Sequence, residues 1–338
     1  MVLRLHSLLL ILVSAALISQ TLAITRTKFT EWYPKAEADL KPSWTTGDCR
    51  DICNAYVQRG QGECGRVLDC TLENTSELRK TTIQAAQVVL VVMPWLLASV
   101  RSSVAEISAS STQRPLLTFL LTLGAPTYQT RVFEYTHPLE VLEALPLQVK
   151  AIKIPCVLQP LISAIQYTLA LAASVNNIEL ALSIGSKSVM AWACGSWYMP
   201  LVWVLFPIST YLVAFVSCSW LNRQQAEEES TSSTHCSMET ACRGLFCCCY
   251  RCLRISYKMR SMPAKADASP IAIMLQMFGC CLAFVHVTLG ALILSSLIFV
   301  GFHDTLGILG RFLASALVCR LITLFQLTMF RASLLMKS

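Results

Sequence analysis

Five long apolar runs constrain the fold of this chain more than any other feature. A helix of about 20 apolar residues crosses about 30 Å of hydrocarbon and satisfies its own backbone hydrogen bonds there. The predicted spans are Thr82–Val100, Ile154–Val175, Met199–Leu221, Pro270–Val300 and Leu306–Phe330. These runs predict an all-α integral membrane protein with five transmembrane helices.

A sixth apolar run is too short to cross a membrane. The stretch "PLLTFLLTLGAP", residues 115–126, holds only about ten apolar residues between two prolines. We interpret it as an interfacial segment, and a re-entrant segment is the alternative. Its length disfavours a sixth span.

The beginning of the chain is typical of exported proteins. Arg4 precedes an apolar stretch from Leu8 to Ile18, and the small residue Ala23 follows. This pattern predicts a signal peptide over residues 1–23, with an uncleaved signal anchor as the alternative. In either case the polar segment that follows, residues 24–81, is predicted to be extracellular or lumenal.

This N-terminal segment is predicted to be a small ectodomain held together by disulfides. It carries an Asn-x-Ser glycosylation sequon at Asn74. It also carries four cysteines: Cys49, Cys53, Cys64 and Cys70. A domain of this size buries little apolar area, so two disulfides are predicted to stabilise it. Nested pairing of Cys53 with Cys64 and Cys49 with Cys70 would close a helical hairpin, and the other two connectivities stay open.

Lysine and arginine set the predicted orientation, because they collect in cytosolic loops. With an exported N-terminus, the loops after spans one and three and the tail are cytosolic, and basic residues gather in them. The loop between spans two and three holds only Lys187, and the turn "GFHDT" holds no lysine or arginine. The predicted regions are the membrane region 82–221, a basic cysteine-rich cytosolic loop 222–269, spans four and five in 270–330, and a cytosolic tail 331–338.

One part of the sequence resembles a known group of proteins. The stretches "DCTLENTSE", "SSVAEIS" and "RPLLTFLLTLGAP" flank or follow an apolar span that contains a proline. Together they resemble an uncharacterised family of multi-spanning membrane proteins of filamentous fungi, over about Asp69 to Tyr135. The resemblance implies a fungal membrane protein and assigns no functional residue.

Two polar residues lie near the middle of predicted spans, where ionisable groups are costly and often functional. Arg320 is in span five and His286 is in span four. They are candidate solute-binding residues. The alternative is structural: an arginine bonded to carbonyls, hydroxyls or Gln326, and a neutral histidine bonded across a helix interface. The five predicted spans contain no Asp or Glu, which lowers the support for coupled cation transport.

The basic loop is predicted to contact the inner leaflet. On a helix, four basic residues share one narrow arc and are predicted to bind anionic lipid: Arg243, Arg251, Arg254 and Lys258. Four neighbouring cysteines are predicted sites of reversible S-palmitoylation: Cys247, Cys248, Cys249 and Cys252. Unmodified cysteines, or a zinc site with His235, Cys236 and Cys242, are the alternatives, and the reducing cytosol disfavours a disulfide knot.

The remaining patterns favour a non-enzymatic protein. With 54% hydrophobic and 14% charged residues, the net charge of +7 is better explained by membrane orientation than by nucleic-acid binding. The sequence lacks the common hydrolase, metalloprotease and nucleotide-binding motifs, so we predict no enzyme activity, cofactor or bound metal. The leading prediction is a receptor-like or scaffold protein with an unknown extracellular or cytosolic protein partner. The alternative is a channel or transporter for an anionic or small solute, and the predicted location is the plasma membrane or another secretory-pathway membrane.

Overall fold

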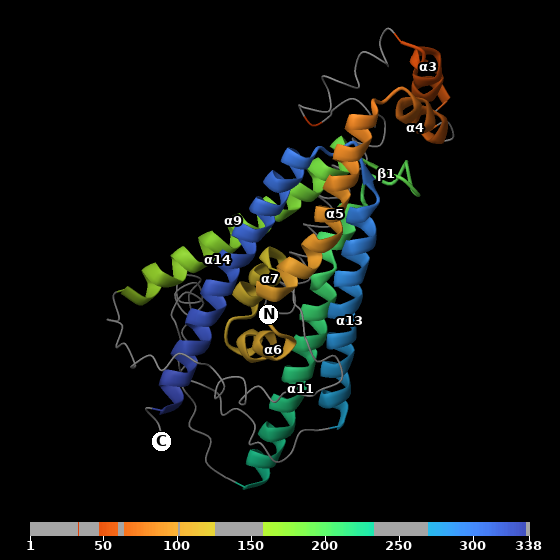
Figure 1. The fold of residues 1–338 in the computed structure, drawn as a ribbon. Coiled ribbons are helices and arrows are strands. Elements are labelled where there is room, and N and C mark those ends of the chain that lie inside the picture. The colour runs from red at the N-terminus through yellow and green to blue at the C-terminus, as the bar shows by residue number, and fades with distance from the viewer. Residues whose placement is uncertain are drawn as a thin grey trace. The chain divides into compact units, whose positions relative to one another are not determined.

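The structure, a computed structural model, describes residues 33, 47–59, 64–100, 102–125, 158–232 and 270–335. Its elements appear in Figure 1 in the following order: α3 (Arg50–Arg59), α4 (Cys64–Glu73), α5 (Glu77–Val100), α6 (Val104–Gln113), α7 (Pro115–Gly124), α9 (Leu158–Lys187), β1 (Val189–Met190), α10 (Met199–Leu205), α11 (Pro207–Ser232), α13 (Pro270–Ser295), β2 (Leu297–Ile298) and α14 (Phe302–Leu335). The signal peptide and the predicted lipid-binding and palmitoylation residues lie outside the described residues.

Five helical segments are long and apolar enough to cross a membrane, as the sequence predicts. They are Glu77–Val100, Leu158–Lys187, Met199–Trp220, Pro270–Ser295 and Phe302–Arg331. The all-α fold class with five candidate spans is therefore confirmed. The shorter apolar helix α7 is the segment that the sequence predicts to be interfacial or re-entrant.

Several span boundaries differ from the prediction, among them the start of the first span, which is Glu77 and not Thr82, and the ends of α9 and α13. Helix α9 continues 12 residues beyond Val175 to Lys187, because the polar side chains that follow Val175 bond to neighbouring helices and do not end the helix. Helix α13 ends at Ser295, five residues before the predicted end at Val300. The chain then forms β2 and turns at Phe299, whose φ of 67° lies in the left-handed region.

The chain forms two compact units, which we describe separately. The first holds the described residues up to Met93, together with Glu179–Val202 and Gly290–Leu309. Its core includes the fully buried side chains Leu90, Met93, Ile184, Met190, Ile293 and Leu294. In it β1 pairs antiparallel with β2, and the Gln87 side chain donates to the Leu297 carbonyl at 3.2 Å.

Two disulfides hold the first unit together. Cys49 pairs with Cys70, as predicted, and joins α3 to α4. The predicted Cys53–Cys64 bond is wrong: Cys64 pairs with Cys194, which lies 130 residues away between β1 and α10. Cys53 keeps a free thiol, and partial burial raises the pKa of that thiol above its ordinary value. Sequence spacing suggested the nearest partner, whereas folding brings a distant loop to Cys64.

The second unit holds Pro94–Ile178, Trp203–Leu289 and the residues from Gly310 onward. Within it, the short helices α6 and α7 form a hairpin that packs against α11. A buried apolar cluster holds this contact together: Val104, Ile107, Tyr211, Ala214, Cys280 and Ala283. The Tyr211 hydroxyl also donates to the Pro115 carbonyl at 2.9 Å.

Candidate functional site

The candidate site is built around the α6–α7 hairpin. Helix α6 begins with a capping box, because the Ser103 hydroxyl accepts from the Glu106 N–H and the Glu106 carboxylate accepts from the Ser103 N–H. Helix α6 ends at Gln113, since Pro115 cannot continue its hydrogen bonding and disfavours a helical conformation at Arg114. Pro115 then starts α7 at a position where its missing N–H costs nothing.

Helix α9 satisfies the last carbonyls of α7. The Ser174 hydroxyl donates to the Leu120 carbonyl at 2.8 Å. The Asn177 amide donates to the carbonyls of Leu123 and Gly124 at 3.1 and 2.8 Å. A side chain at Gly124 would collide with the Cys319 sulfur, so glycine allows α14 to approach this end of α7. These contacts let a short helix end inside the unit, where unpaired carbonyls would be costly.

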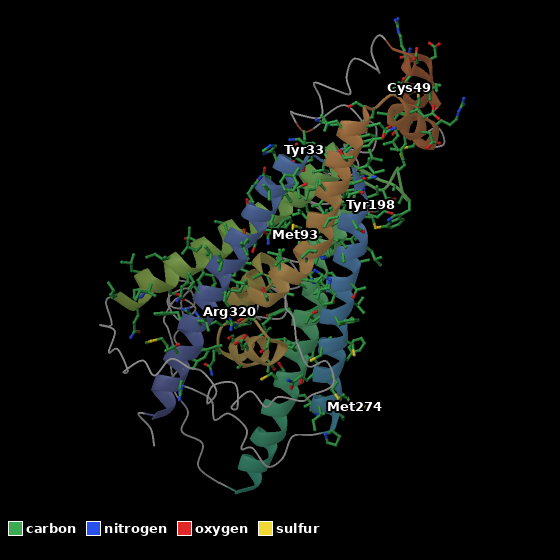
Figure 2. The ribbon with its side chains drawn as sticks, viewed as in Figure 1. Tyr33, Cys49, Met93, Tyr198, Met274 and Arg320 are labelled. Carbon is green, nitrogen blue, oxygen red and sulfur yellow. A yellow bond between two sulfur atoms is a disulfide. The ribbon has the colours of Figure 1, made fainter. Side chains whose placement is uncertain are left out.

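Arg320 forms an ion pair with Glu106. The Arg320 Nη1 donates to Glu106 Oε2 at 2.6 Å and lies 3.5 Å from the Ser102 hydroxyl. Figure 2 labels Arg320. The side chains are 25% and 9% exposed. Only the hydroxyl was among the partners that the sequence suggested for Arg320. The carboxylate was missed because α6 is outside the five predicted spans, so the search of those spans for Asp and Glu passed over Glu106.

A second buried cluster surrounds Arg114. Its guanidinium donates to Gln166 Oε1 at 2.8 Å and to the Ser163 hydroxyl, and it lies 5.8 Å from the Tyr167 ring centroid. Gln326 donates to the same Gln166 oxygen at 2.9 Å. Gln326 therefore belongs to the Arg114 cluster and is not the partner of Arg320. Arg114 lies in the loop after span one, which the sequence predicts to be cytosolic, but only 7% of Arg114 is exposed.

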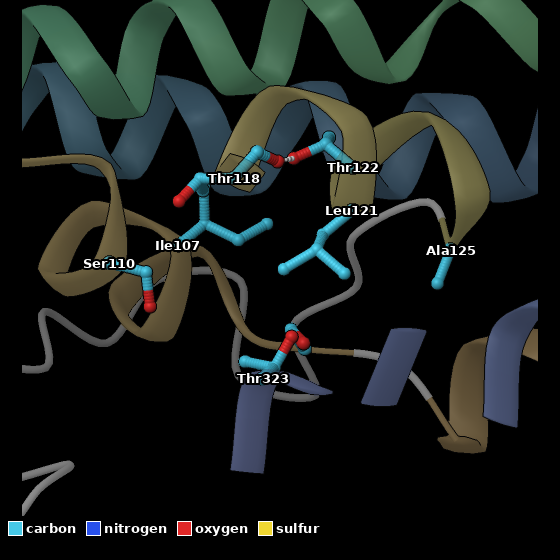
Figure 3. A pocket seen from close by; sticks show the side chains of 8 residues that line it. Ile107, Ser110, Thr118, Leu121, Thr122, Ala125 and Thr323 are labelled. Carbon is cyan, nitrogen blue, oxygen red and sulfur yellow. Dashed lines mark hydrogen bonds between the residues drawn. The ribbon is translucent and has the colours of Figure 1, made fainter. Parts of the chain in front are cut away.

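A small polar pocket lies between α6, α7 and α14. Five of its eight lining residues carry hydroxyl groups: Ser102, Ser110, Thr118, Thr122 and Thr323. The others are Ile107, Leu121 and Ala125 (Figure 3). Ser102 links the pocket to the ion pair, because its hydroxyl also faces Arg320. A pocket lined in part by hydroxyl groups, beside a partly buried ion pair, is suited to hold a small polar molecule.

His286 has a different environment from Arg320. Its ring stacks on Trp203 at 5.5 Å and on Phe206 at 5.7 Å, and its Nε2 lies 3.0 Å from the Trp203 carbonyl. In a continuous helix that carbonyl would accept from the N–H of residue 207, but Pro207 has none. Because a carbonyl only accepts, Nε2 of His286 carries the proton. This contact places His286 at the break between α10 and α11, where its ring supplies the donor that Pro207 lacks.

This role of His286 predicts that the stability lost when His286 is replaced depends on Pro207. His286→Leu removes the hydrogen bond to the Trp203 carbonyl. That carbonyl then accepts only from the Phe206 N–H, at 3.3 Å. We therefore expect the free energy of unfolding to fall by about 1 kcal/mol. Pro207→Ala restores an N–H, and His286→Leu should cost less in that background. Denaturation in mixed detergent micelles measures both costs, and equal costs in the two backgrounds would contradict the role.

The predicted glycosylation site lies at the end of α4. Asn74 is exposed, yet its amide donates to the Cys70 carbonyl at 3.0 Å and lies 3.4 Å from the Cys49 sulfur. The folded N-terminal segment therefore uses the same nitrogen that would carry a glycan. Glycosylation of Asn74 stays a prediction.

One local signal could have identified Glu106 from the sequence. Ser103 followed three residues later by Glu106 is the pattern of a capping box, which marks the start of a helix directly after span one. That helix would have placed a carboxylate next to the run at 115–126. The pairing with Arg320 carries no such local signal.

Comparison with known proteins identifies no relative. No family model, no curated protein and no solved structure matches the chain. The resemblance to fungal membrane proteins therefore gains no support, and the function must be argued from the geometry of this chain.

Proposed function

We propose that this multi-spanning membrane protein is not an enzyme, and that its second unit binds a small solute and lets it cross the membrane. The observation that carries this proposal is the ion pair of Glu106 and Arg320 beside a hydroxyl-lined pocket. The sequence favoured a receptor-like or scaffold protein. The geometry favours the alternative, a channel or transporter.

The physical argument starts from the cost of polar groups in hydrocarbon. Ionisable residues at membrane depth are rare and usually mark a solute path or a pairing that stabilises the fold. Short helices that end inside a membrane protein are tolerated where neighbouring protein or a cavity surrounds them, and they often form solute sites in transporters. Here the α6–α7 hairpin supplies the short helices, the carboxylate and most of the pocket lining. Glu106 supplies a carboxylate beside the five predicted spans, which themselves contain no Asp or Glu.

Solute flux into vesicles tests the proposed function. The purified full-length chain, reconstituted in vesicles, is expected to raise the flux of at least one small solute from a panel of water, urea, glycerol and chloride. The neutral double variant Glu106→Gln/Arg320→Met should reduce that flux at least tenfold while eluting as a folded protein. Glu77→Gln, which removes the exposed Lys80–Glu77 pair at 2.8 Å, is the matched control and should leave flux unchanged. Flux equal to that of empty vesicles for every solute would contradict the proposal.

A receptor-like or scaffold role is the second candidate, and the first unit supports it. The Cys64–Cys194 bond ties the N-terminal helices to the loop before α10, and the same unit places Lys187 5.9 Å from the Tyr33 ring. That loop exposes Trp192, and Tyr198 is exposed next to α10. A fixed surface with exposed aromatic residues suits a protein partner. If the set of cross-linked surface partners is the same after Cys64→Ser/Cys194→Ser, this role loses its support.

The membrane location of the protein and its lipid contacts are the remaining parts of the proposal. The five candidate spans imply contact with a lipid bilayer. A plasma-membrane location and contact of the basic loop with anionic inner-leaflet lipid stay predictions. The Cys64–Cys194 bond supports an extracellular or lumenal location for the N-terminal helices and for the loop before α10, since disulfides persist in oxidising compartments.

A further inference from the structure

Three of the five hydroxyl groups that line the pocket are placed to accept hydrogen bonds. Thr118 donates its hydroxyl proton to the Arg114 carbonyl at 3.0 Å, Thr122 to the Thr118 carbonyl at 2.7 Å (Figure 3), and Thr323 to the Cys319 carbonyl at 3.0 Å. A hydroxyl has one proton and two lone pairs, so these three oxygens have only acceptor capacity left. A molecule that binds to them must therefore donate hydrogen bonds.

Ser110 gives independent support for a ligand. It is 3% exposed, and its hydroxyl has no hydrogen-bond partner among the described residues. A buried hydroxyl without a partner is costly, and most such groups are bonded to protein or to an ordered small molecule. Because Ser110 lines the pocket, a molecule bound there would supply the missing partner.

Charge and size narrow the class of ligand. The Glu106–Arg320 pair beside the pocket carries no net charge, so it offers no counter-charge to an ion, and burying an unpaired cation is costly. The acceptor oxygens of the threonines disfavour an anion, and Glu106 already neutralises Arg320. The space available to the centre of a water molecule is about 10 Å³, which is room for about one water molecule.

We propose that this pocket selects a neutral hydrogen-bond donor of about the size of water, so that the solute of the second unit is a small neutral molecule and not an ion. The proposal rests on the proposed function and names its solute class. It replaces the anionic solute that Arg320 suggests by itself, because the carboxylate of Glu106 neutralises the arginine.

Radiolytic hydroxyl labelling of the full-length chain in nanodiscs tests the pocket directly, since bound water forms radicals next to buried side chains. Ile107 and Leu121, which line the pocket and are 4% and 7% exposed, should be labelled. Leu117 and Ile322, which are 0% and 7% exposed and do not line it, are the controls and should stay unlabelled. The isosteric Thr122→Val should lower labelling of Leu121 severalfold. Labelling of the lining residues at the level of the controls would overturn the proposal.

Flux measurements separate this inference from the proposed function. Vesicles with the wild-type chain should show faster water permeation than empty vesicles and unchanged chloride flux, and Thr122→Val should slow the water permeation severalfold. Chloride flux that depends on Arg320, without added water permeation, would overturn the neutral-solute inference and leave the transport function standing. Labelling of the pocket without flux of any solute would overturn both the transport function and the selectivity role of the pocket.

Discussion

Glu106→Gln is expected to lower the free energy of unfolding by about 3–5 kcal/mol, because it leaves the Arg320 guanidinium in a largely buried site without its counter-charge. Glutamine keeps the acceptor oxygen that the capping box needs, so the loss reports mainly on the charge. Arg320→Met should cost a similar amount, since it leaves the Glu106 carboxylate uncompensated. Reversible denaturation in mixed detergent micelles measures these losses.

The double variant Glu106→Gln/Arg320→Met distinguishes a coupled pair from two independent sites. It should lose less stability than the sum of the two single variants, because neither charge is left alone. Glu77→Gln is the matched control: its pair with Lys80 is exposed, so its removal should change stability by about 0–1 kcal/mol. Additive losses would mean that Glu106 and Arg320 do not form the pair seen in the second unit.

Removing the Cys64–Cys194 bond is expected to lower the free energy of unfolding of the first unit by about 2–5 kcal/mol. The double variant Cys64→Ala/Cys194→Ala leaves no unpaired thiol, so the loss reports on the cross-link alone. The bond restrains the unfolded chain across a separation of 130 residues, which is the case where a disulfide has a large entropic effect. Thermal unfolding followed by proteolysis of the first unit measures the change.

Cys53→Ala is the control for this variant. Cys53 is half-buried and forms no disulfide, so Cys53→Ala should lower the free energy of unfolding much less than Cys64→Ala/Cys194→Ala does. Mass spectrometry of the unreduced wild type should find a peptide that joins Cys64 to Cys194. A Cys53–Cys64 peptide in its place, with Cys53→Ala as damaging as the double variant, would restore the nested pairing that the sequence suggests.

The candidate site could be predicted only in part. Arg320 and His286 stood out because ionisable groups in apolar runs are costly, and that rule needs only local sequence. Their roles differ for reasons that local sequence does not contain. Arg320 meets a carboxylate from a helix too short to span, whereas His286 meets a carbonyl released by Pro207 on another helix.

The helical class and the five spans follow from the apolar runs in the sequence, whereas the Cys49–Cys70 bond belongs to one of three connectivities that the cysteine spacing left open. Hydrocarbon thickness fixes the length of a span, and the need to satisfy backbone groups fixes its helical form. The partners of Cys64 and Arg320 and the enclosure of the α6–α7 hairpin depend on the tertiary fold. These contacts join residues that are 53 positions apart for Gly124 and Asn177, 130 for Cys64 and Cys194 and 214 for Glu106 and Arg320, and over such separations the local side-chain pattern gives no distance.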